Sequence, residues 1–174
     1  MLTPPMKLTV TRLDQGRYET LVTRGDGVSY RLKGVAHAFA IPHDLAHFVV
    51  EKALRLDRGF WANVADGAVF KSMSYIAGRR KPKAAERSES LLKSNAAPLN
   101  EAEALVRIFN DTIEQGHDEG SLLLQQRLQQ RLARPGLAFR RFSAAEISEV
   151  YSGYRDMLSK WEKLAAGGRL DLQW

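Results

Sequence analysis

From Lys7 to Thr23 the chain reads KLTVTRLDQGRYETLVT, and this stretch decides the fold class. Apolar and polar residues alternate through Lys7–Thr11 and again through Tyr18–Val22, which is the pattern of half-buried β-strands. The residues Asp14-Gln15-Gly16 lie between the two runs and favour a tight turn. The stretch therefore predicts two antiparallel strands joined by a short hairpin loop.

A third short run of alternating residues, Val28–Leu32, follows a second turn at Gly25-Asp26-Gly27. Together the three runs predict an antiparallel β-meander over residues 6–34. Such a small sheet is not stable alone and needs a helical layer packed on one face. The fold class expected for the chain is therefore α+β.

The segment after the meander carries the signals of two helices. Pro42 is suited to the first helical position, and we predict a helix from there to about Leu56. Gly59 allows a break, after which Phe60 begins a shorter apolar helix that ends near Asp66. Residues 42–76 are thus expected to form the histidine-bearing helix and a short helix.

Residues 77–98 differ in composition from the segments on either side. They begin with the basic run Arg79-Arg80-Lys81-Pro82-Lys83 and continue with many Ser, Lys and Ala residues but few large apolar ones. We interpret them as a basic, flexible connection.

The C-terminal part, residues 99–167, predicts three helices. Asn100 with Glu103 resembles a capping box at the start of the first, and Ser143 with Glu146 is a fuller capping box at the start of the third. The expectation for residues 1–174 is thus a single domain, with the meander packed against a mainly helical body of about five helices.

Several classes of protein are excluded or disfavoured by composition. The chain has no cysteine, so disulfides, thiolate metal ligands and a cysteine nucleophile are excluded. It contains no apolar run of the ~20 residues that a membrane span needs, and its N-terminal residues lack the pattern of a signal peptide. We expect a cytoplasmic protein with no membrane partner.

The most informative chemical feature is a pair of histidines, His43 and His47, within Pro42-His43-Asp44-Leu45-Ala46-His47. In a helix the second ring is displaced about 40° around the axis and about 6 Å along it from the first. Both imidazoles can therefore face one divalent metal ion such as zinc. The predicted helix places them at the edge of its buried face, where they could line a cleft.

His43-Asp44-Leu45-Ala46-His47 resembles the His-Glu-x-x-His motif of zincin metalloproteases, over these five residues. Asp44 stands where that family has a glutamate acting as general base. The resemblance implies a metal-dependent hydrolase in which Asp44 would take the role of the base. No further His or Glu ligand of the kind that such families place downstream is evident in residues 48–59.

A complete metal site needs at least one further ligand, and the sequence leaves its identity open. His37 could approach from the preceding extended segment, and His117 could arrive from a distant helix connection. Glu51 follows His47 by one turn and fits best as a hydrogen-bond partner that orients the His47 ring. The candidate residues are His43, His47 and His37 as metal ligands, with Asp44 and Glu51 in catalysis.

The alternative function is a non-enzymatic interaction module. The formal charge of +6 and the pI near 9.7 favour contact with nucleic acid or an acidic protein. Two groups of basic residues could make this contact: Arg79–Lys83 and the set Arg127, Arg131, Arg134, Arg140 and Arg141. A homo-oligomer held together by the helices is a third possibility.

Overall fold

The computed structural model describes residues 4–35, 40–132 and 141–174. Its strands are β1 (Lys7–Arg12), β2 (Arg17–Thr23), β3 (Ser29–Val35), β4 (Ser74–Ala77) and β5 (Arg169–Gln173). Its helices are α1 (His43–Ala53), α2 (Phe60–Asp66), α3 (Ala84–Ser94), α4 (Ala96–Glu114), α5 (Leu122–Leu132) and α6 (Ala144–Glu162). The α+β class is confirmed.

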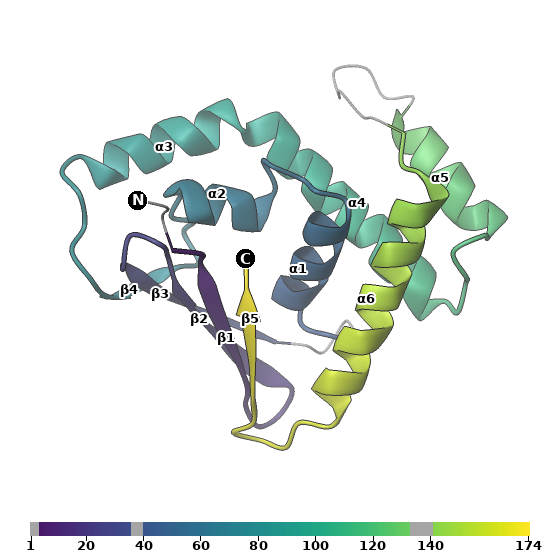
Figure 1. Cartoon of the computed structure of the whole chain (residues 1–174), viewed down its shortest axis with the longest axis horizontal. Helices are drawn as coiled ribbons and strands as arrows, with labels where there is room; N and C mark the ends of the chain where they lie inside the picture. The colour runs from purple at the N-terminus through teal and green to yellow at the C-terminus, as the bar shows by residue number, and fades with distance from the viewer. Residues whose placement is uncertain (1–3, 36–39, 133–140) are drawn as a thin grey trace.

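The sheet has the strand order β4-β3-β2-β1-β5, and every neighbouring pair is antiparallel. The expected meander is present as β1 to β3, but two further strands extend it at its edges. The last strand, β5, returns from the far end of the chain and places Leu172 opposite Leu8 of β1. Figure 1 shows β5 beside β1, so both ends of the described chain meet in one sheet.

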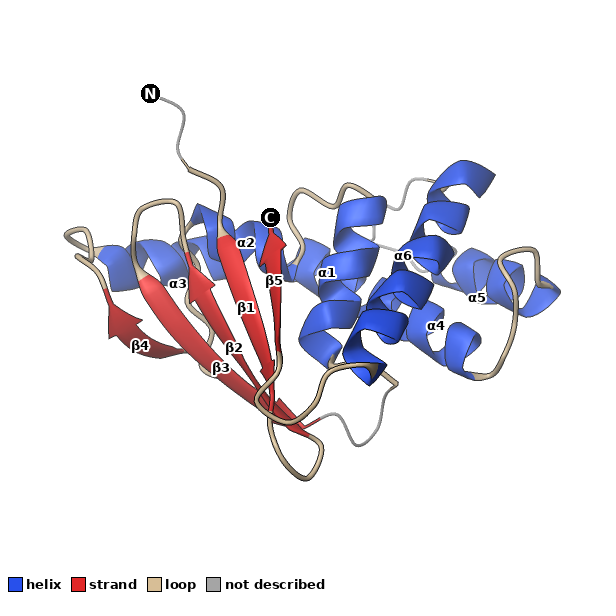
Figure 2. Ribbon diagram, turned by 60° about the horizontal axis from the view of Figure 1, so that its bottom comes forward, coloured by secondary structure: helices blue, strands red, loops and turns tan. Residues whose placement is uncertain are grey.

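One face of the sheet belongs to the core. Leu8, Val10, Val22, Tyr30 and Leu32 are all buried, whereas their neighbours on the same strands, Thr9, Leu21 and Arg31, are exposed or half-buried. This alternation is what the period of two in the sequence predicted. Figure 2 shows the strands at one end of the molecule, with α1, α4, α5 and α6 gathered at the other.

Helix α1 is the centre of the helical part. It packs against α2, α4 and α6, and most of its residues are buried. Trp61 of α2 is fully buried, and its indole Nε1 donates to the backbone oxygen of Asp44 at 3.0 Å. The site that α1 carries is therefore enclosed by helices that come from distant parts of the sequence.

Residues 77–98 differ from the expected connection, because they contain α3 and the first residues of α4. Ala, Glu, Arg, Leu and Lys are good helix formers, and their propensity supports α3 despite its few apolar residues. Ser88 anchors this helix: its buried hydroxyl accepts from the backbone N–H of Val69 at 2.8 Å. The described residues thus form six helices, where about five were expected.

The start expected for α4 was also wrong. The helix begins at Ala96, so Asn100 and Glu103 lie inside it and do not form a capping box. At α6, by contrast, the capping box is confirmed: the Glu146 N–H donates to Ser143 Oγ at 3.2 Å, and the Ser143 N–H donates to Glu146 Oε2 at 2.9 Å. No helix in the described ranges is both long enough and apolar enough to cross a membrane.

Removing the cap of α6 should lower stability measurably. Because Ser143→Ala leaves an N–H of the first turn without its acceptor, we expect it to reduce the free energy of unfolding by about 1 kcal/mol in urea titrations. Ser152→Ala, an exposed serine in the middle of the same helix, is the matched control. Equal stability of the two variants would contradict the capping role.

Candidate metal centre

The two histidines of α1 face one another at the helix surface. Their Nε2 atoms are 3.2 Å apart, and their rings meet edge to face with centroids separated by 4.6 Å. His47 is buried, while the side chain of His43 is 36% exposed. The i, i+4 spacing has therefore brought two imidazole nitrogens to one point, as the sequence predicted.

A carboxylate from α4 completes the group. Glu103 Oε2 lies 3.0 Å from His47 Nε2 and 3.3 Å from His43 Nε2. Helix α4 packs against α1, which places Glu103 directly opposite the histidine pair. Among the His, Asp and Glu side chains of the described residues, His43, His47 and Glu103 form the one group of three that could hold a metal ion.

The spacing of these three atoms suits a small divalent ion. Zinc bound at roughly 2.0–2.2 Å separates its tetrahedral ligands by about 3.3 Å. The observed separations of 3.0, 3.2 and 3.3 Å fall at or slightly below that value. The three side chains could thus bind one ion with only small movements.

His47 is held in one orientation by the next turn of its own helix. Its Nδ1 lies 2.7 Å from Glu51 Oε1, so the Nδ1–H donates to that carboxylate. With its Nδ1–H held by Glu51, a His47 that gives up its Nε2 proton would present the Nε2 lone pair to a metal ion between His43 and Glu103. A carboxylate hydrogen-bonded to the outer nitrogen is the arrangement that commonly accompanies metal-binding histidines.

Glu51 is itself fixed by the start of α2. Its carboxylate is fully buried and accepts the backbone N–H of Phe60 at 2.7 Å and that of Trp61 at 3.0 Å. These two donors satisfy a charge that burial would otherwise penalise heavily. Both oxygens are therefore engaged, which makes Glu51 an orienting group for His47.

Gly59 provides the space for the Glu51 carboxylate. A Cβ atom added at this glycine would lie 2.4 Å from Glu51 Cδ, far inside van der Waals contact. The backbone there has an ordinary extended conformation, with φ at −73°. Gly59 is thus required for its small size and not for unusual backbone freedom.

The electrostatics of the cluster follow from these contacts. Burial alone would lower the pKa of His47, but its hydrogen bonds to Glu103 and Glu51 raise that pKa to about 9. The hydrogen bonds from His43 and His47 hold the pKa of Glu103 well below its usual range. The group thus keeps Glu103 as a carboxylate, the form that binds cations.

A pocket of about 360 Å³ opens beside the cluster. Four large apolar residues, Leu32, Phe60, Phe70 and Leu99, line it together with the polar residues His43, Asp44, His47, Ser72, Asn100 and Glu103. A metal held by three protein ligands would therefore have room for water or a small substrate beside it.

Asp44 also lines this pocket, next in sequence to His43. Its Oδ2 accepts from Thr20 Oγ1 of β2 at 2.8 Å. Burial raises the pKa of the Asp44 carboxyl, although the hydrogen bond from Thr20 works in the opposite direction. The sheet thus fixes the one carboxyl group that the sequence placed beside the first histidine.

Some of the predicted site residues lie close together in the structure, and others do not. His43, His47, Asp44 and Glu51 come together, whereas His37 lies outside the described residues. His117 is exposed beyond the end of α4, roughly 16 Å or more along that helix from Glu103. It does not belong to the cluster.

Glu103 was missed as a site residue because its local sequence suggested a helix cap. The one other indication in the sequence is that Glu103 lies between two apolar residues, Ala102 and Leu105, which are both buried. That pattern places Glu103 at the border of the buried face of α4. Nothing in the sequence indicates that this border faces His43 and His47.

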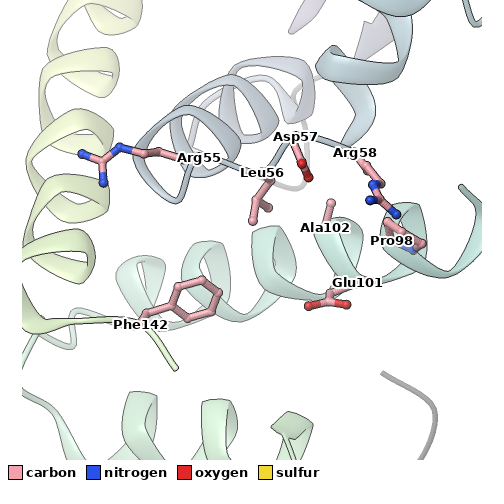
Figure 3. A pocket seen from close by; sticks show the side chains of 9 residues that line it. Arg55, Leu56, Asp57, Arg58, Pro98, Glu101, Ala102 and Phe142 are labelled. Atoms are coloured by element: carbon pink, nitrogen blue, oxygen red, sulfur yellow. The ribbon is translucent and has the colours of Figure 1, made fainter. Parts of the chain in front are cut away.

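A second pocket, of about 340 Å³, lies on the connection between α1 and α2 and does not include the cluster. Figure 3 shows Arg55 and Arg58 at the two ends of this connection, with Phe142 on the far side of the pocket. Arg55 is 4.0 Å from carboxylate oxygens of both Glu146 and Glu149. Its charge is thus already balanced by acidic groups of α6.

The structure describes only some of the basic residues that were expected to form an interaction surface. Arg79, Arg80, Lys81 and Lys83 are exposed between β4 and α3, and Arg80 lies over the exposed Tyr75 ring at 4.1 Å. An aromatic side chain therefore accompanies this run, which the sequence did not suggest. Of the second set, Arg127, Arg131 and Arg141 are described, and Arg134 and Arg140 fall outside the described residues.

Filling the space at Gly59 should disturb the Glu51 carboxylate. Because the added methyl group would overlap Glu51, we expect Gly59→Ala to lower the free energy of unfolding by about 2 kcal/mol. Gly120→Ala is the matched control, since its Cβ would meet its nearest atom at an ordinary 3.6 Å. Chemical denaturation of both metal-free variants tests this, and a wild-type value for Gly59→Ala would contradict it.

Comparison with known proteins finds no matching family model, no matching curated protein and no matching solved structure. The functional proposals therefore rest on the residues and geometry of this chain.

Proposed function

We propose that the protein binds a divalent metal ion through His43, His47 and Glu103 and acts as a metal-dependent hydrolase. The observation that carries the proposal is the convergence of two imidazole nitrogens and one carboxylate oxygen, with separations of 3.0 to 3.3 Å. Two histidines and one glutamate are among the ligand sets of catalytic zinc sites. Zinc is therefore the first ion to test.

The surroundings support a catalytic rather than a purely structural role for the metal. Structural zinc sites have four protein ligands and are closed, while catalytic sites keep a position open for water or substrate. Here three ligands border a pocket of about 360 Å³. Glu51 would keep His47 in the ligating tautomer while the open side of the ion faced the pocket.

The chemistry proposed is attack by metal-activated water on a polar bond of the substrate. A divalent ion held by His43, His47 and Glu103 would act as a Lewis acid that lowers the pKa of a water molecule beside it, and the Asp44 carboxylate would accept the proton that this water loses. The oxygen of that water would form a bond to the electrophilic atom of the substrate as the bond to the leaving group breaks. The proton passes from Asp44 to the leaving group, which returns the carboxylate to its starting state.

A second candidate function is an interaction module that contacts nucleic acid or an acidic protein. The observation in its favour is the exposed basic run Arg79–Lys83 together with Tyr75, which is 43% exposed beside Arg80. Aromatic stacking combined with basic side chains is a common means of holding single-stranded nucleic acid. This surface is formed at the β4 edge of the sheet, on different elements from the metal centre.

Metal binding can be tested directly by elemental analysis and zinc titration. We expect stoichiometric zinc in wild-type protein, and a loss of at least about 100-fold in affinity in His47→Ala and Glu103→Gln, because each removes one of three ligands. His117→Ala and Glu101→Gln are the matched controls, since neither residue belongs to the cluster. The metal proposal fails if the wild type binds no divalent ion or if all four variants bind zinc equally.

Catalysis requires a separate test from binding. With chromogenic carboxylic and phosphate esters as substrates, we expect Asp44→Asn to retain zinc and to lower kcat by about 10² to 10⁴, as loss of a general base does. Asp66→Asn, at the exposed end of α2, should leave kcat unchanged. Full activity in zinc-loaded Asp44→Asn would exclude Asp44 as the base.

A further inference from the structure

We infer that the groove between α4 and α5 binds the phosphoryl group of a phosphate ester and that this groove supplies the substrate side of the metal centre. The groove has a volume of about 370 Å³ and is lined by Ala104, Arg107, Ile108, Asp111, Arg127, Gln130 and Arg131. The inference rests on the proposed function where it concerns the substrate, but anion binding by the groove is independent of any metal.

The groove is lined mainly by positively charged side chains among its ionisable residues. Three arginines line it, and its lining residues include a single carboxylate, that of Asp111. The formal charges of the lining residues sum to +2, but Glu103 pairs with Arg107 and Glu101 interacts with Arg131 just outside the groove, so Arg127 is the cation whose charge is least offset. Guanidinium groups present forked pairs of N–H donors that match phosphate oxygens, so the residue type fits the ligand as well as the charge does.

The partners of Arg127 leave its charge available. Its guanidinium donates to Thr112 Oγ1 at 3.3 Å and to Gln115 Oε1 at 3.4 Å, and both acceptors are neutral. These contacts orient the group along α4 without cancelling its charge. The side chain is half-buried, so the orientation is partly fixed before any ligand arrives.

Two contacts connect the groove to the metal centre. Arg107 donates to Glu103 Oε1 at 3.3 Å, while the other oxygen of Glu103 faces the histidines. Arg131 donates to the backbone oxygen of Asn100 at 3.4 Å, and Asn100 and Glu103 both line the metal pocket. Arg107 follows Glu103 by one helical turn, about 6 Å along α4.

This arrangement names a substrate class for the proposed hydrolase. A phosphate ester lying along α4 with its phosphoryl group among the arginines would extend toward the pocket beside the histidines. The bond hydrolysed would then lie in that extended part of the molecule, and the phosphoryl group would serve to bind and position it. The phosphoryl group could come from a small phosphate ester or from a nucleic acid. The chemistry of recognition is the same in both cases.

The decisive variants lie at Gln130, an exposed groove residue of α5. With metal-free protein and inorganic phosphate as the probe in calorimetric titrations, we expect Gln130→Glu to weaken binding about threefold and Gln130→Lys to strengthen it about threefold, because only the local charge changes. Arg127→Gln should weaken binding about tenfold, as the loss of a charge-assisted hydrogen bond does. Arg155→Gln, an exposed arginine of α6, should bind as the wild type does.

Several results would overturn the inference. Absence of phosphate binding, equal affinity in both Gln130 variants, or succinate binding as tightly as phosphate would each exclude a phosphoryl site in the groove. Loss of phosphate binding in the metal-free double variant His43→Ala/His47→Ala would also contradict it, because the groove does not include those residues. Conversely, phosphate binding by a protein that takes up no metal would support the groove and reject the proposed hydrolase.

A short single-stranded oligonucleotide distinguishes the two sources of the phosphoryl group. If the Gln130 variants change oligonucleotide affinity in the same directions as phosphate affinity, the groove holds a nucleic-acid phosphate. If oligonucleotide binding is absent, or falls only in Arg79→Gln/Arg80→Gln, while the Gln130 variants still change phosphate affinity, the ligand is a small phosphate ester.

Discussion

A fully buried carboxylate, that of Glu51, holds the candidate site together. A buried and unpaired charge costs several kcal/mol, so this group can exist only where the fold provides donors for it. Two backbone N–H groups at the start of α2 and the Nδ1–H of His47 fill that need. The same interaction therefore fixes α2 against α1, excludes a larger residue at Gly59 and determines which nitrogen of His47 faces the pocket.

The second constraint is that α4 serves two surfaces at once. Asn100, Glu103, Arg107 and Asp111 lie along one stripe of the helix; Asn100 and Glu103 line the metal pocket, and Arg107 and Asp111 line the groove. Glu103 takes part in both, since one of its oxygens faces the histidines and the other accepts from Arg107. A ligand in the groove that engaged Arg107 would act on the same carboxylate that faces the metal.

The buried face of the sheet contributes residues to the site. Leu32 of β3 lines the pocket, and Thr20 of β2 donates to the Asp44 carboxylate. Both residues lie on the buried face of the meander, where the alternation of side chains directs them toward α1. The meander is thus more than a support for the helices, because it sets the position of the proposed general base.

Features encoded within a few residues could be read from the sequence. The β1 to β3 meander follows from a period of two, the capped start of α6 from Ser143 and Glu146, and the pairing of His43 with His47 from their spacing on one helix. Even the contact between His47 and Glu51 follows from one helical turn. Each of these depends on local backbone geometry, which the residues involved largely determine themselves.

Features that join distant segments were decided only by the tertiary structure. Glu103 meets His43 and His47 across 60 and 56 positions, and β5 pairs with β1 across most of the chain. Helix α3 is anchored by a contact between Ser88 and Val69 that the composition of residues 77–98 did not indicate. Such contacts depend on how whole apolar faces pack, and that packing leaves no mark in the sequence beside any one of the residues it brings together.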